Sequence, residues 1–515
     1  MSLGQMFVSG LSAVWGGGSM FLMVVVAIVL GTIFGALPGV SATMAVALGL
    51  TFTYTMEPVA AIVFLTAIYC SSITGGSITA ILFKISGVPS SAPTTFDGYP
   101  MAQRGEAGKA LGVALFASAI GGLFSALVMF LMSSPLSKAA LAFGQGDLFA
   151  ITFLGLSILV VLDTDHILTT IISGLLGLLL ACIGQDPMAG VARLTFGQVN
   201  LLSGMEMIPV LIGLFAVTEV FKQTNAKKRL SADDGIGKGK VSTKMPSVKE
   251  IWSIKWVMLR CAIVGTIVGI LPGAGATIAS FMCYTMENKL SKYPEKFGTG
   301  VIDGIAASET ANNAATGGAM VPLLSLGIPG GNAAAVMASA LALKGVQMGP
   351  LLLTNQPEYL SATFITMLIT NILMVVVAIG IAKVFAQILA IPYYYLGPII
   401  LLLATIGSYS EGGFVGVKVM VIAGVFGIIV KYMHLNSAAI VLGLVLGGMC
   451  EQHFSLAFQG AHIVTSPMTF SDIMQKIFGA LFGTPIAAVV MTVCILMLLS
   501  PIYMPLIKKA SGKAK

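Results

Sequence analysis

Four polar residues stand close together in the otherwise apolar stretch from Asp303 to Asn332. Glu309 is followed by Asn312, Asn313 and Thr316, a spacing that gathers them within about two turns of a helix. A carboxyl group at membrane depth is a candidate functional group, because burying its charge in hydrocarbon is costly. We take these four residues as candidate ligands of a coupling ion. The alternative is that Glu309 caps a helix or faces water near the membrane surface.

The same stretch carries two signals that interrupt a helix. One is Pro322, and the other is Gly-Ile-Pro-Gly-Gly at residues 327–331. In hydrocarbon every unpaired backbone group is costly, so a broken helix survives only where it lines a cavity or is buried in protein. Secondary transporters place substrate and ions at such breaks. We therefore predict two helix breaks here and half of a transport site.

A matching break lies in the first half of the chain, at residues 87–91. It has the same order of Gly, a β-branched residue and Pro, followed by small residues. Proline suits the start of a helix, and the free N–H groups beyond it attract anions. Two such tips can hold one carboxylate from two sides; the alternative is that both are tight turns. The candidate substrate-binding residues are Gly87, Pro89, Ser90, Ser91, Gly327, Pro329, Gly330, Gly331 and Asn332.

Two Leu-Pro-Gly sequences, around Pro38 and Pro272, supply further candidate ion ligands. Carbonyl groups freed at a break, together with Ser, Thr or Asn oxygens, form a hard cage of low charge that suits sodium. The alternative is a proline kink relieved by a hydroxyl group. The residues added to the candidate ion site are Ser41, Thr43, Thr74 and Thr277.

Two charged residues lie near the first tip. Lys84 either balances a substrate carboxylate or extends its side chain to the membrane surface. Asp97 stands in T-T-F-D-G-Y-P, and we expect it to be a turn residue.

The composition is that of a membrane protein. Of the 515 residues, 57% are hydrophobic and 9% are charged, whereas a soluble domain carries about 25% charged residues. This predicts an all-α polytopic membrane protein. The net charge of +7 gathers in loops, which indicates topology rather than nucleic-acid binding. The six cysteines lack metal-ligand spacing, so we expect no cofactor and no metal other than sodium. No basic residue precedes Lys84, so we expect no cleaved signal peptide.

Apolar runs divide the chain into two halves. We expect a first membrane repeat over residues 1–222, a basic cytoplasmic linker over 223–250 and a second repeat over 251–515. Each repeat is expected to contain about seven membrane segments and one hairpin. The first-half segments are 20–37, 40–56, 58–72, 107–132, 148–162, 166–184 and 206–221, with a re-entrant hairpin near 75–100. The second-half segments are 251–273, 274–286, 359–389, 396–409, 412–430, 435–450 and 473–499, with a broken-helix hairpin near 303–332.

Four motifs recur in the same order in the two halves. G-A-L-P-G-V-S-A-T-M-A at Gly35 matches G-I-L-P-G-A-G-A-T-I-A at Gly269, and Y-T-M-E, T-G-G and the two tips recur as well. The offsets are 234 (35 to 269), 230 (54 to 284), 242 (74 to 316) and 240 (86 to 326). Four ordered matches indicate a duplicated unit.

The two repeats are expected to be inverted, because an odd number of crossings turns the second copy over. Charges agree: three lysines follow residue 286, whereas the equivalent loop after residue 56 has no basic residue. Conversely, Arg104 and Lys109 follow the first hairpin, and the counterpart loop carries only Lys344. Because basic loops face the cytoplasm, we predict a periplasmic N-terminus and a cytoplasmic linker and C-terminus.

Several longer motifs between Gly35 and Pro350 resemble a known family. They are P-G-V-S-A-T, G-G-S-I-T-A-I-L, T-T-F-D-G-Y-P-M-A with G-E-A-G-K-A-L-G, P-G-A-G-A-T and S-E-T-A-N-N-A-A-T-G-G-A-M-V-P-L-L-S-L-G-I-P-G. Together they resemble the large membrane subunit of tripartite tricarboxylate transporters. The resemblance implies a bacterial inner-membrane permease subunit that works with a small four-span membrane subunit and a periplasmic solute-binding protein. It also implies uptake of citrate-like or other carboxylates, driven by an ion gradient that is commonly sodium, and kinship with elevator-type transporters.

The leading hypothesis is a cation-coupled importer of carboxylates, and the alternative is a carboxylate transporter that works without a binding protein. A channel would need a continuous polar pore, whereas the polar residues here cluster at two breaks. An intramembrane enzyme would need paired acids or a motif such as H-E-x-x-H, which the sequence lacks. Membrane lipid is a further partner, and a homo-oligomer is left open. The binding protein is expected to dock on a loop at 333–358 beside the second tip.

Overall fold

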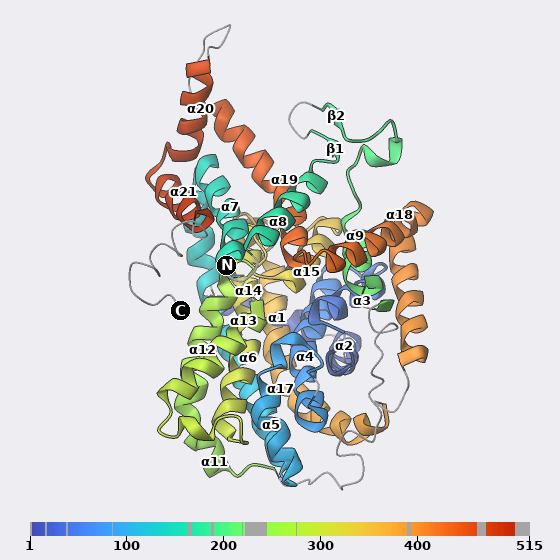
Figure 1. Cartoon of the computed structure of the whole chain (residues 1–515), viewed down its shortest axis with the longest axis vertical. Helices are drawn as coiled ribbons and strands as arrows, with labels where there is room; N and C mark the ends of the chain where they lie inside the picture. Colours follow the sequence, from blue (N-terminus) through green and yellow to red (C-terminus); the bar gives the residue numbers. More distant parts are fainter. Residues whose placement is uncertain are drawn as a thin grey trace. The chain divides into compact units, whose positions relative to one another are not determined.

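The computed structural model is helical almost throughout (Figure 1). It describes residues 3–15, 18–37, 40–84, 86–162, 167–186, 190–218, 220–221, 245–273, 275–388, 393–460 and 470–499. Within these residues the exception is a hairpin of two short antiparallel strands. The expected all-α class is therefore confirmed. Pro38, residues 223–244 of the predicted linker and the tail after residue 499 lie outside the described residues.

The chain forms two compact units, and each contains segments from both halves of the sequence. The first unit is Met1–Ser137 with Ile208–Ile428, and the second is Lys138–Met207 with Ile429–Lys515. The contents of the units therefore differ from the predicted division at the linker. Compact units and sequence repeats need not coincide, so the predicted repeats over residues 1–222 and 251–515 stay a prediction.

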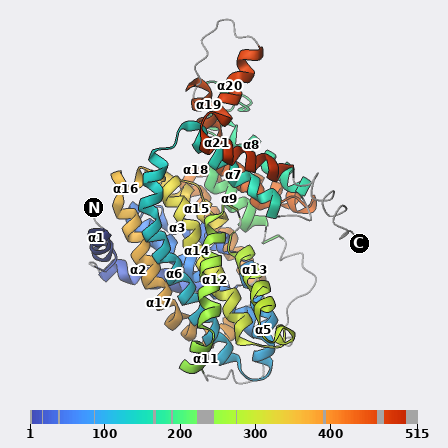
Figure 2. The same ribbon diagram turned by 90° about the vertical axis from the view of Figure 1, so that its left-hand side faces the viewer.

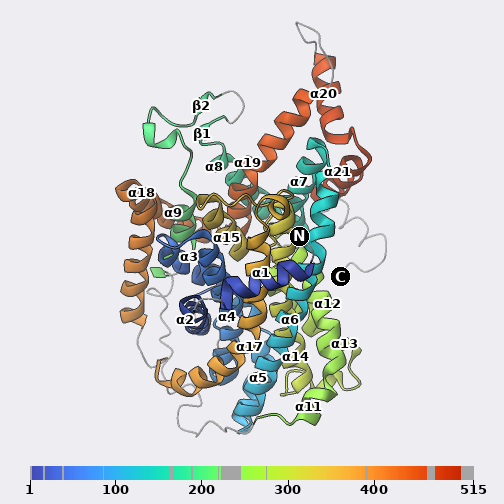
Figure 3. The ribbon, with the colours of Figure 1, turned by 180° about the vertical axis from the view of Figure 1, so that it is seen from behind.

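Most helices belong to the first unit. In its N-terminal part the elements are α1 (Leu3–Trp15), α2 (Gly18–Ala36), α3 (Ala42–Thr53), α4 (Pro58–Phe83), the 3-10 turn η1 (Pro89–Ser91), α5 (Thr94–Gln103) and most of α6 (Ala107–Leu141). In its C-terminal part they are α9 (Met207–Ile212), the π-helical turn η3 (Gly213–Val217), α11 (Val248–Ser253), α12 (Lys255–Ile270), α13 (Gly275–Leu290), the 3-10 turn η5 (Pro294–Lys296), α14 (Ile302–Leu326), α15 (Asn332–Leu343), α16 (Leu352–Asn355), α17 (Pro357–Ile388) and most of α18 (Tyr393–Tyr432). Helices α12, α13 and α14 lie side by side (Figure 2), and α1 lies against α17 (Figure 3).

The second unit is smaller. Its elements are α7 (Gln145–Leu162), α8 (Ile167–Ala181), β1 (Gly184–Gln185), β2 (Ala192–Arg193), the 3-10 turn η2 (Val199–Leu201), α19 (Ser437–Gly460), α20 (Phe470–Phe482) and α21 (Pro485–Leu498). Asp147 joins two of them, because its carboxylate accepts hydrogen bonds from the Thr484 hydroxyl and the backbone N–H of Ala487 at the start of α21. A carboxylate at a helix N-terminus is stabilising.

Helices α2 and α4 pack through small residues. A Cβ atom on Gly35 would collide with the backbone of Ser72, and one on Gly75 would collide with the carbonyl of Thr32. The Thr32 hydroxyl is satisfied within its own helix, where it donates to the carbonyl of Ile28 at 2.7 Å. Small residues of this kind let two membrane helices approach closely.

Helices α12 and α14 repeat this contact in the second half. A Cβ atom on Gly269 would collide with the backbone of Ala315, and one on Gly318 would collide with the carbonyl of Thr266. The Thr266 hydroxyl donates to the carbonyl of Ala262 at 2.7 Å. Gly269 and Thr266 lie at the 234-residue offset that separates the two Leu-Pro-Gly motifs, so the motif repeat extends to the packing of these helices. The inversion of one copy relative to the other stays a prediction.

Two predicted helix interruptions are wrong. The first hairpin does not begin at Gly75, because α4 continues to Phe83 and ends at Lys84, whose φ of +58° is left-handed. The break at Pro322 is also absent, because α14 runs through it to Leu326. A proline removes only one backbone donor, and a helix packed on several neighbours tolerates that loss. The real interruption of α14 starts at Gly327, with a φ of +78°.

The number of membrane spans is lower than expected when length and composition are the criteria. Among the described residues six helices qualify, or seven if the bent pair α20 and α21 is one span. The predicted span at 473–499 consists of two helices that meet at 96°, so it is either a broken span or a re-entrant loop. Some other predicted spans correspond to short helices. For example, α3 has 12 residues, whereas a helix that crosses the membrane straight needs about 20. About seven crossings in each half therefore stays a prediction.

The loop expected at 333–358 is largely helical. Residues Asn332–Leu343 form α15, and Ala333–Met337 within it are buried. The sequence N-A-A-A-V-M-A-S-A-L-A-L is rich in residues of high helix propensity, which explains the difference.

Candidate functional site

A buried carboxylate lies at the centre of the first unit. Glu309, two turns into α14, has no solvent exposure. Its carboxylate accepts hydrogen bonds from the hydroxyl of Thr94 in α5, and from the Ser118 hydroxyl in α6 and the side-chain amide of Asn312, both at 3.2 Å. The donors come from three helices, so tertiary packing satisfies a group that would otherwise be costly to bury. Glu309 is not a helix cap and does not face water in this structure.

Asn313 extends this network to α4. Its side-chain amide donates to the Asn312 side chain at 2.7 Å and to the Glu309 carbonyl at 3.1 Å. The oxygen of the same amide accepts a hydrogen bond from the Thr74 hydroxyl at 2.8 Å. Four of the eight predicted ion ligands, Thr74, Glu309, Asn312 and Asn313, thus form one continuous hydrogen-bonded network across the two halves of the chain.

The first tip touches the same network. The Asn312 amide donates to the carbonyl of Ser90 at 3.3 Å. The hydroxyl oxygens of Ser90 and Ser91 are buried and lack a hydrogen-bond partner among the described residues. Gly87 is held against the carbonyl of Gly35, where a Cβ atom would not fit, and Pro89 is exposed. Two unsatisfied oxygens beside a buried carboxylate form a candidate binding site for a cation or a polar substrate group.

The second tip contacts the Leu-Pro-Gly break of its own half. The backbone N–H of Gly273 donates to the Gly330 carbonyl at 3.2 Å. Gly331 is the residue before α15 and Asn332 is its first residue, so the N–H groups at this helix start are available to an anion. Pro329 is buried and Gly327 ends α14. Among the described residues no hydrogen bond joins the two tips, so a shared carboxylate stays a prediction.

The other four predicted ion ligands, all of them described residues, are not hydrogen-bonded to any side chain of the network. Ser41 caps α3 by accepting from the N–H of Met44 at 3.1 Å. The Thr316 hydroxyl donates to the Asn313 carbonyl at 2.6 Å and is buried one turn beyond the network. Thr43 is buried in α3, and Thr277 is half-buried in α13. Within the part of the chain that the structure describes, no hydrogen bond connects Ser41, Thr43 or Thr277 to Glu309.

Three residues of the network were not predicted. Thr94 and Ser118 donate to Glu309, and Ser308 shares a 2.9 Å hydrogen bond with Thr94. A lone serine in an apolar helix, such as Ser118, is usually a packing residue, so its sequence gave no signal. Ser308 is adjacent to Glu309 and could have been found from that position alone.

Equivalent basic residues at the ends of α5 and α15 hold loops of the opposite half. Arg104 donates to the carbonyls of Thr299 and of Gly300, the latter at 2.8 Å. Lys344 donates to the carbonyls of Tyr54 and of Met56, the latter at 3.0 Å. The two residues are separated by 240 positions, the same offset as the tips. Each residue therefore anchors a loop of the other half of the chain. This role accounts for a basic residue after each tip whichever side of the membrane the loop faces.

Asp97 is not a turn residue. It lies in α5, is fully buried, and accepts hydrogen bonds from the Tyr284 hydroxyl at 2.8 Å and from three backbone N–H groups at 2.8–3.0 Å. Those N–H groups belong to the loop before α14, at Gly298, Gly300 and Val301. The carboxylate therefore fixes the start of the helix that carries Glu309. The motif has the residue types of a turn. The hydrogen-bond partners of Asp97 are about 190 to 200 residues away, so the local sequence does not reveal them.

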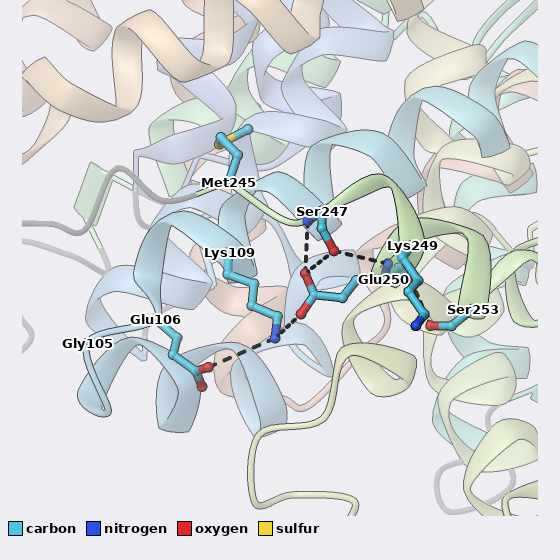
Figure 4. A pocket seen from close by; sticks show the side chains of 8 residues that line it. All are labelled: Gly105, Glu106, Lys109, Met245, Ser247, Lys249, Glu250 and Ser253. Carbon is cyan, nitrogen blue, oxygen red and sulfur yellow. Dashed lines mark hydrogen bonds and ion pairs between the residues drawn. The ribbon is translucent and has the colours of Figure 1, made fainter.

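A separate pocket of about 660 Å³ opens between the start of α6 and α11 (Figure 4). Lys109 lies in it, 2.5 Å from Glu250 and 4.0 Å from Glu106. Since both acids engage this lysine, the pocket does not offer a free positive charge from Lys109 to a carboxylate. Lys84 is exposed and lies over the ring of Tyr99, away from any partner acid that the described residues provide.

Comparison with known proteins identifies the family of this chain. The family model for the tripartite tricarboxylate transporter TctA family matches residues 21–442. The chain belongs to the tripartite tricarboxylate transporter TctA family. All residues of the Glu309 network, and both tips, fall inside the matched range. The resemblance inferred from the motifs is confirmed, and membership in a transporter family fits the expectation that the chain is not an enzyme.

Two relatives from Agrobacterium vitis extend the comparison. The chain is 37% identical over 433 residues to an uncharacterized 52.8 kDa protein in the TAR-I ttuC' 3' region, covering 84% of this chain and 86% of that protein. It is 36% identical over 213 residues to an uncharacterized protein in the TAR-II ttuC' 3' region, covering 40% of this chain and 88% of that protein. No solved structure matches the chain.

Proposed function

We propose that this chain is the large permease subunit of a tripartite importer of tricarboxylates or related carboxylates in a bacterial inner membrane. The family membership supports a component of a tricarboxylate transporter. The observation that carries a transport site is the buried Glu309 network, which joins helices from both halves beside the unsatisfied oxygens of the first tip. Partners in this proposal are a small four-span membrane subunit and a periplasmic solute-binding protein.

Uptake is coupled to a cation, and sodium is the favoured one. A tricarboxylate is polyanionic near neutral pH, and an inside-negative potential opposes its entry by about 2.3 kcal/mol per charge per 100 mV. Co-transported cations offset this work. The oxygens around Glu309 are hydroxyl, amide and carbonyl groups, which suit a hard cation. Protons are the alternative, because Glu309 itself can carry one.

In this proposal the chain binds the ion and the substrate at adjacent places. Glu309, Thr94 and Ser118 would hold the cation, with the Ser90 and Ser91 hydroxyls completing the oxygen set. The N–H groups after Gly331 would bind a substrate carboxylate. Binding the cation at Glu309 lowers the local negative charge, which favours an incoming anion. An elevator-type movement of inverted repeats belongs to the same proposal.

Proteoliposomes test the function directly. The purified chain and its small subunit are reconstituted into liposomes. Uptake of each labelled carboxylate of a panel is then measured with and without a sodium gradient, a pH gradient and a periplasmic extract. We expect saturable uptake that needs the extract and follows sodium. Uptake that ignores sodium but follows pH would select protons. Full-rate uptake without any extract would instead support a stand-alone transporter.

Topology is tested by reporter fusions at Gly237 and after Lys515. We expect a cytoplasmic signal at both places, because the linker and the tail are rich in Lys and Arg. A periplasmic signal at either place would overturn the proposed orientation and the inverted repeat with it.

A further inference from the structure

An apolar surface in the second unit has no role in the proposed site. Between α8 and α9 the chain forms the β1–β2 hairpin and an irregular segment that exposes large apolar side chains. Phe196 is 83% exposed and Val199 is 76% exposed, and Val191 and Leu194 are exposed beside them in sequence. We call Val191, Leu194, Phe196 and Val199 the 191–199 surface.

This surface lies outside the hydrocarbon core of the membrane. Its backbone is strand and irregular loop rather than helix. Lipid-exposed backbone of that kind is not tolerated at membrane depth, because its polar groups would be unsatisfied. The four apolar side chains are therefore placed where water or a soluble partner reaches them. Exposed apolar groups that occur together on a soluble surface mark interaction sites.

The segment is held in a fixed conformation. Arg193 makes a bidentate contact with Glu451 of α19, with one oxygen at 3.0 Å, and lies 3.2 Å from Asp186. Strand pairing joins Gly184 to Arg193, and the Gln185 N–H donates to the Leu202 carbonyl at 3.0 Å. These contacts tie the segment to itself and to a long helix of the same unit. A surface fixed in advance loses less entropy on binding.

Two residues of the surface have unfavourable backbone angles. Leu194 and Phe196 have φ values of +52° and +50°, in the left-handed region that side chains other than glycine seldom adopt. Such strain persists only where surrounding contacts impose it, and it gathers at functional sites. Here it is found at two of the four exposed apolar residues of the 191–199 surface.

Charge distinguishes a protein partner from a membrane surface. From residue 190 to 205 the sole charged residue is Arg193, whose guanidinium is engaged by two acids. Peripheral binding to anionic lipid relies on free Lys or Arg. The segment offers no free basic side chain, and Gln198 and Asn200 supply uncharged polar groups beside the apolar ones. Exposed apolar side chains with uncharged polar neighbours and few charges are typical of a protein–protein interface.

We propose that the 191–199 surface is where the soluble solute-binding protein docks on this chain. The inference rests on the proposed function, because the proposed topology places the linker after α9 in the cytoplasm and this surface on the periplasmic side. It differs from the 333–358 region that the sequence suggested, where Ala333–Met337 are buried in α15 but Leu343 and Leu351 are exposed.

The test uses the full chain with its small subunit in proteoliposomes, supplied with periplasmic shock fluid from the source cells. The variant is Phe196→Ser with Val199→Ser, and the matched control is Val248→Ser, at an apolar residue that is 85% exposed in the first unit. We expect the shock fluid to stimulate wild type and control. The variant should need roughly tenfold more fluid or more, because truncating two interface anchors removes at least about one factor of ten in affinity. Insertion into the liposomes should be the same in all three.

The outcomes separate this inference from the function on which it rests. If the fluid stimulates wild type and variant equally, the docking surface is wrong while the tripartite function stands. If the fluid stimulates neither wild type nor control, the tripartite function fails and the inference falls with it. A photoreactive benzoylphenylalanine at position 196 gives a second readout. An adduct with a soluble protein, lost together with stimulation in the Val199→Ser background, is expected; an adduct with lipid or with a second copy of the chain overturns the proposal.

Discussion

The second tip allows a sharp steric prediction at two adjacent glycines. A Cβ atom at Gly330 would lie 2.5 Å from the Cα of Ala319 and 2.5 Å from the carbonyl oxygen of Gly269. Non-bonded carbon atoms are comfortable at about 3.5 Å, so the tip would have to move by about 1 Å. Both obstacles are helix backbone, which cannot move as easily as the end of a flexible side chain. Overpacking of this kind typically costs about 1–3 kcal/mol.

Gly331 is the matched control. A Cβ atom there would meet its nearest neighbour, the Cα of Gly275, at 3.6 Å, which is an ordinary contact. Its φ of −175° is extended backbone that any residue adopts. We therefore expect Gly330→Ala to lower the free energy of unfolding by about 1–3 kcal/mol and Gly331→Ala to leave it within about 0.5 kcal/mol. Thermal unfolding of the detergent-purified variants measures the difference.

Uptake separates packing from substrate binding at the same tip. If the N–H groups after Gly331 bind a carboxylate, Gly331→Leu should raise the KM for uptake while the melting temperature stays near that of Gly331→Ala. Gly330→Ala should lower uptake together with stability. Equal stability of the two alanine variants would falsify the close contact between the tip, α12 and α14. An unchanged KM in Gly331→Leu would show that the tip is only a turn.

Three further predictions concern charged groups of the first unit. Glu309→Gln should lower gradient-driven uptake by more than about tenfold while leaving membrane insertion intact, because an intramembrane acid is a functional group by default; wild-type uptake in this variant, measured in proteoliposomes, would remove Glu309 from the coupling site. Asp97→Ala should lower the free energy of unfolding by at least about 2 kcal/mol, since it leaves buried donors unsatisfied, whereas the exposed Arg104→Ala should cost less than about 1 kcal/mol; denaturant unfolding compares them, and equal losses would contradict the assigned roles. The hydrogen bond from Lys109, followed by those from Ser247, lowers the pKa of Glu250 to about 2. A lowered folded-state pKa gives stability that is present above the unfolded value of about 4.3 and lost as pH falls through about 2. The melting-temperature difference between wild type and Glu250→Gln should therefore be constant from pH 5 to 8 and shrink in acid, and a difference that grows in acid would refute the pairing.

The sequence by itself determined the class of protein and several residues of the candidate site. Low charge and long apolar runs leave a polytopic helical membrane protein as the solution, because a soluble fold would need more polar surface. The Gly-Ile-Pro-Gly-Gly break was correct because glycine and proline restrict the backbone locally, whatever surrounds them. Glu309, Asn312 and Asn313 were found because polar groups are conspicuous in an apolar helix. The motif repeat also predicted the equivalent positions of Gly35 and Gly269, which the structure uses in equivalent helix contacts.

Tertiary structure decided which of these residues meet and what they do. Pro322 looks like a helix breaker, and the first hairpin was expected to begin near residue 75, yet α14 and α4 continue through these positions because neighbouring helices compensate for a weak local preference. Asp97 appeared to belong to a turn, whereas its partners are supplied by a loop in the other half of the chain. Ser118 carried no signal at all until α6 brought its hydroxyl to Glu309. Hydrogen bonds between residues about 190 to 240 positions apart depend on how helices pack, and local sequence does not encode that distance.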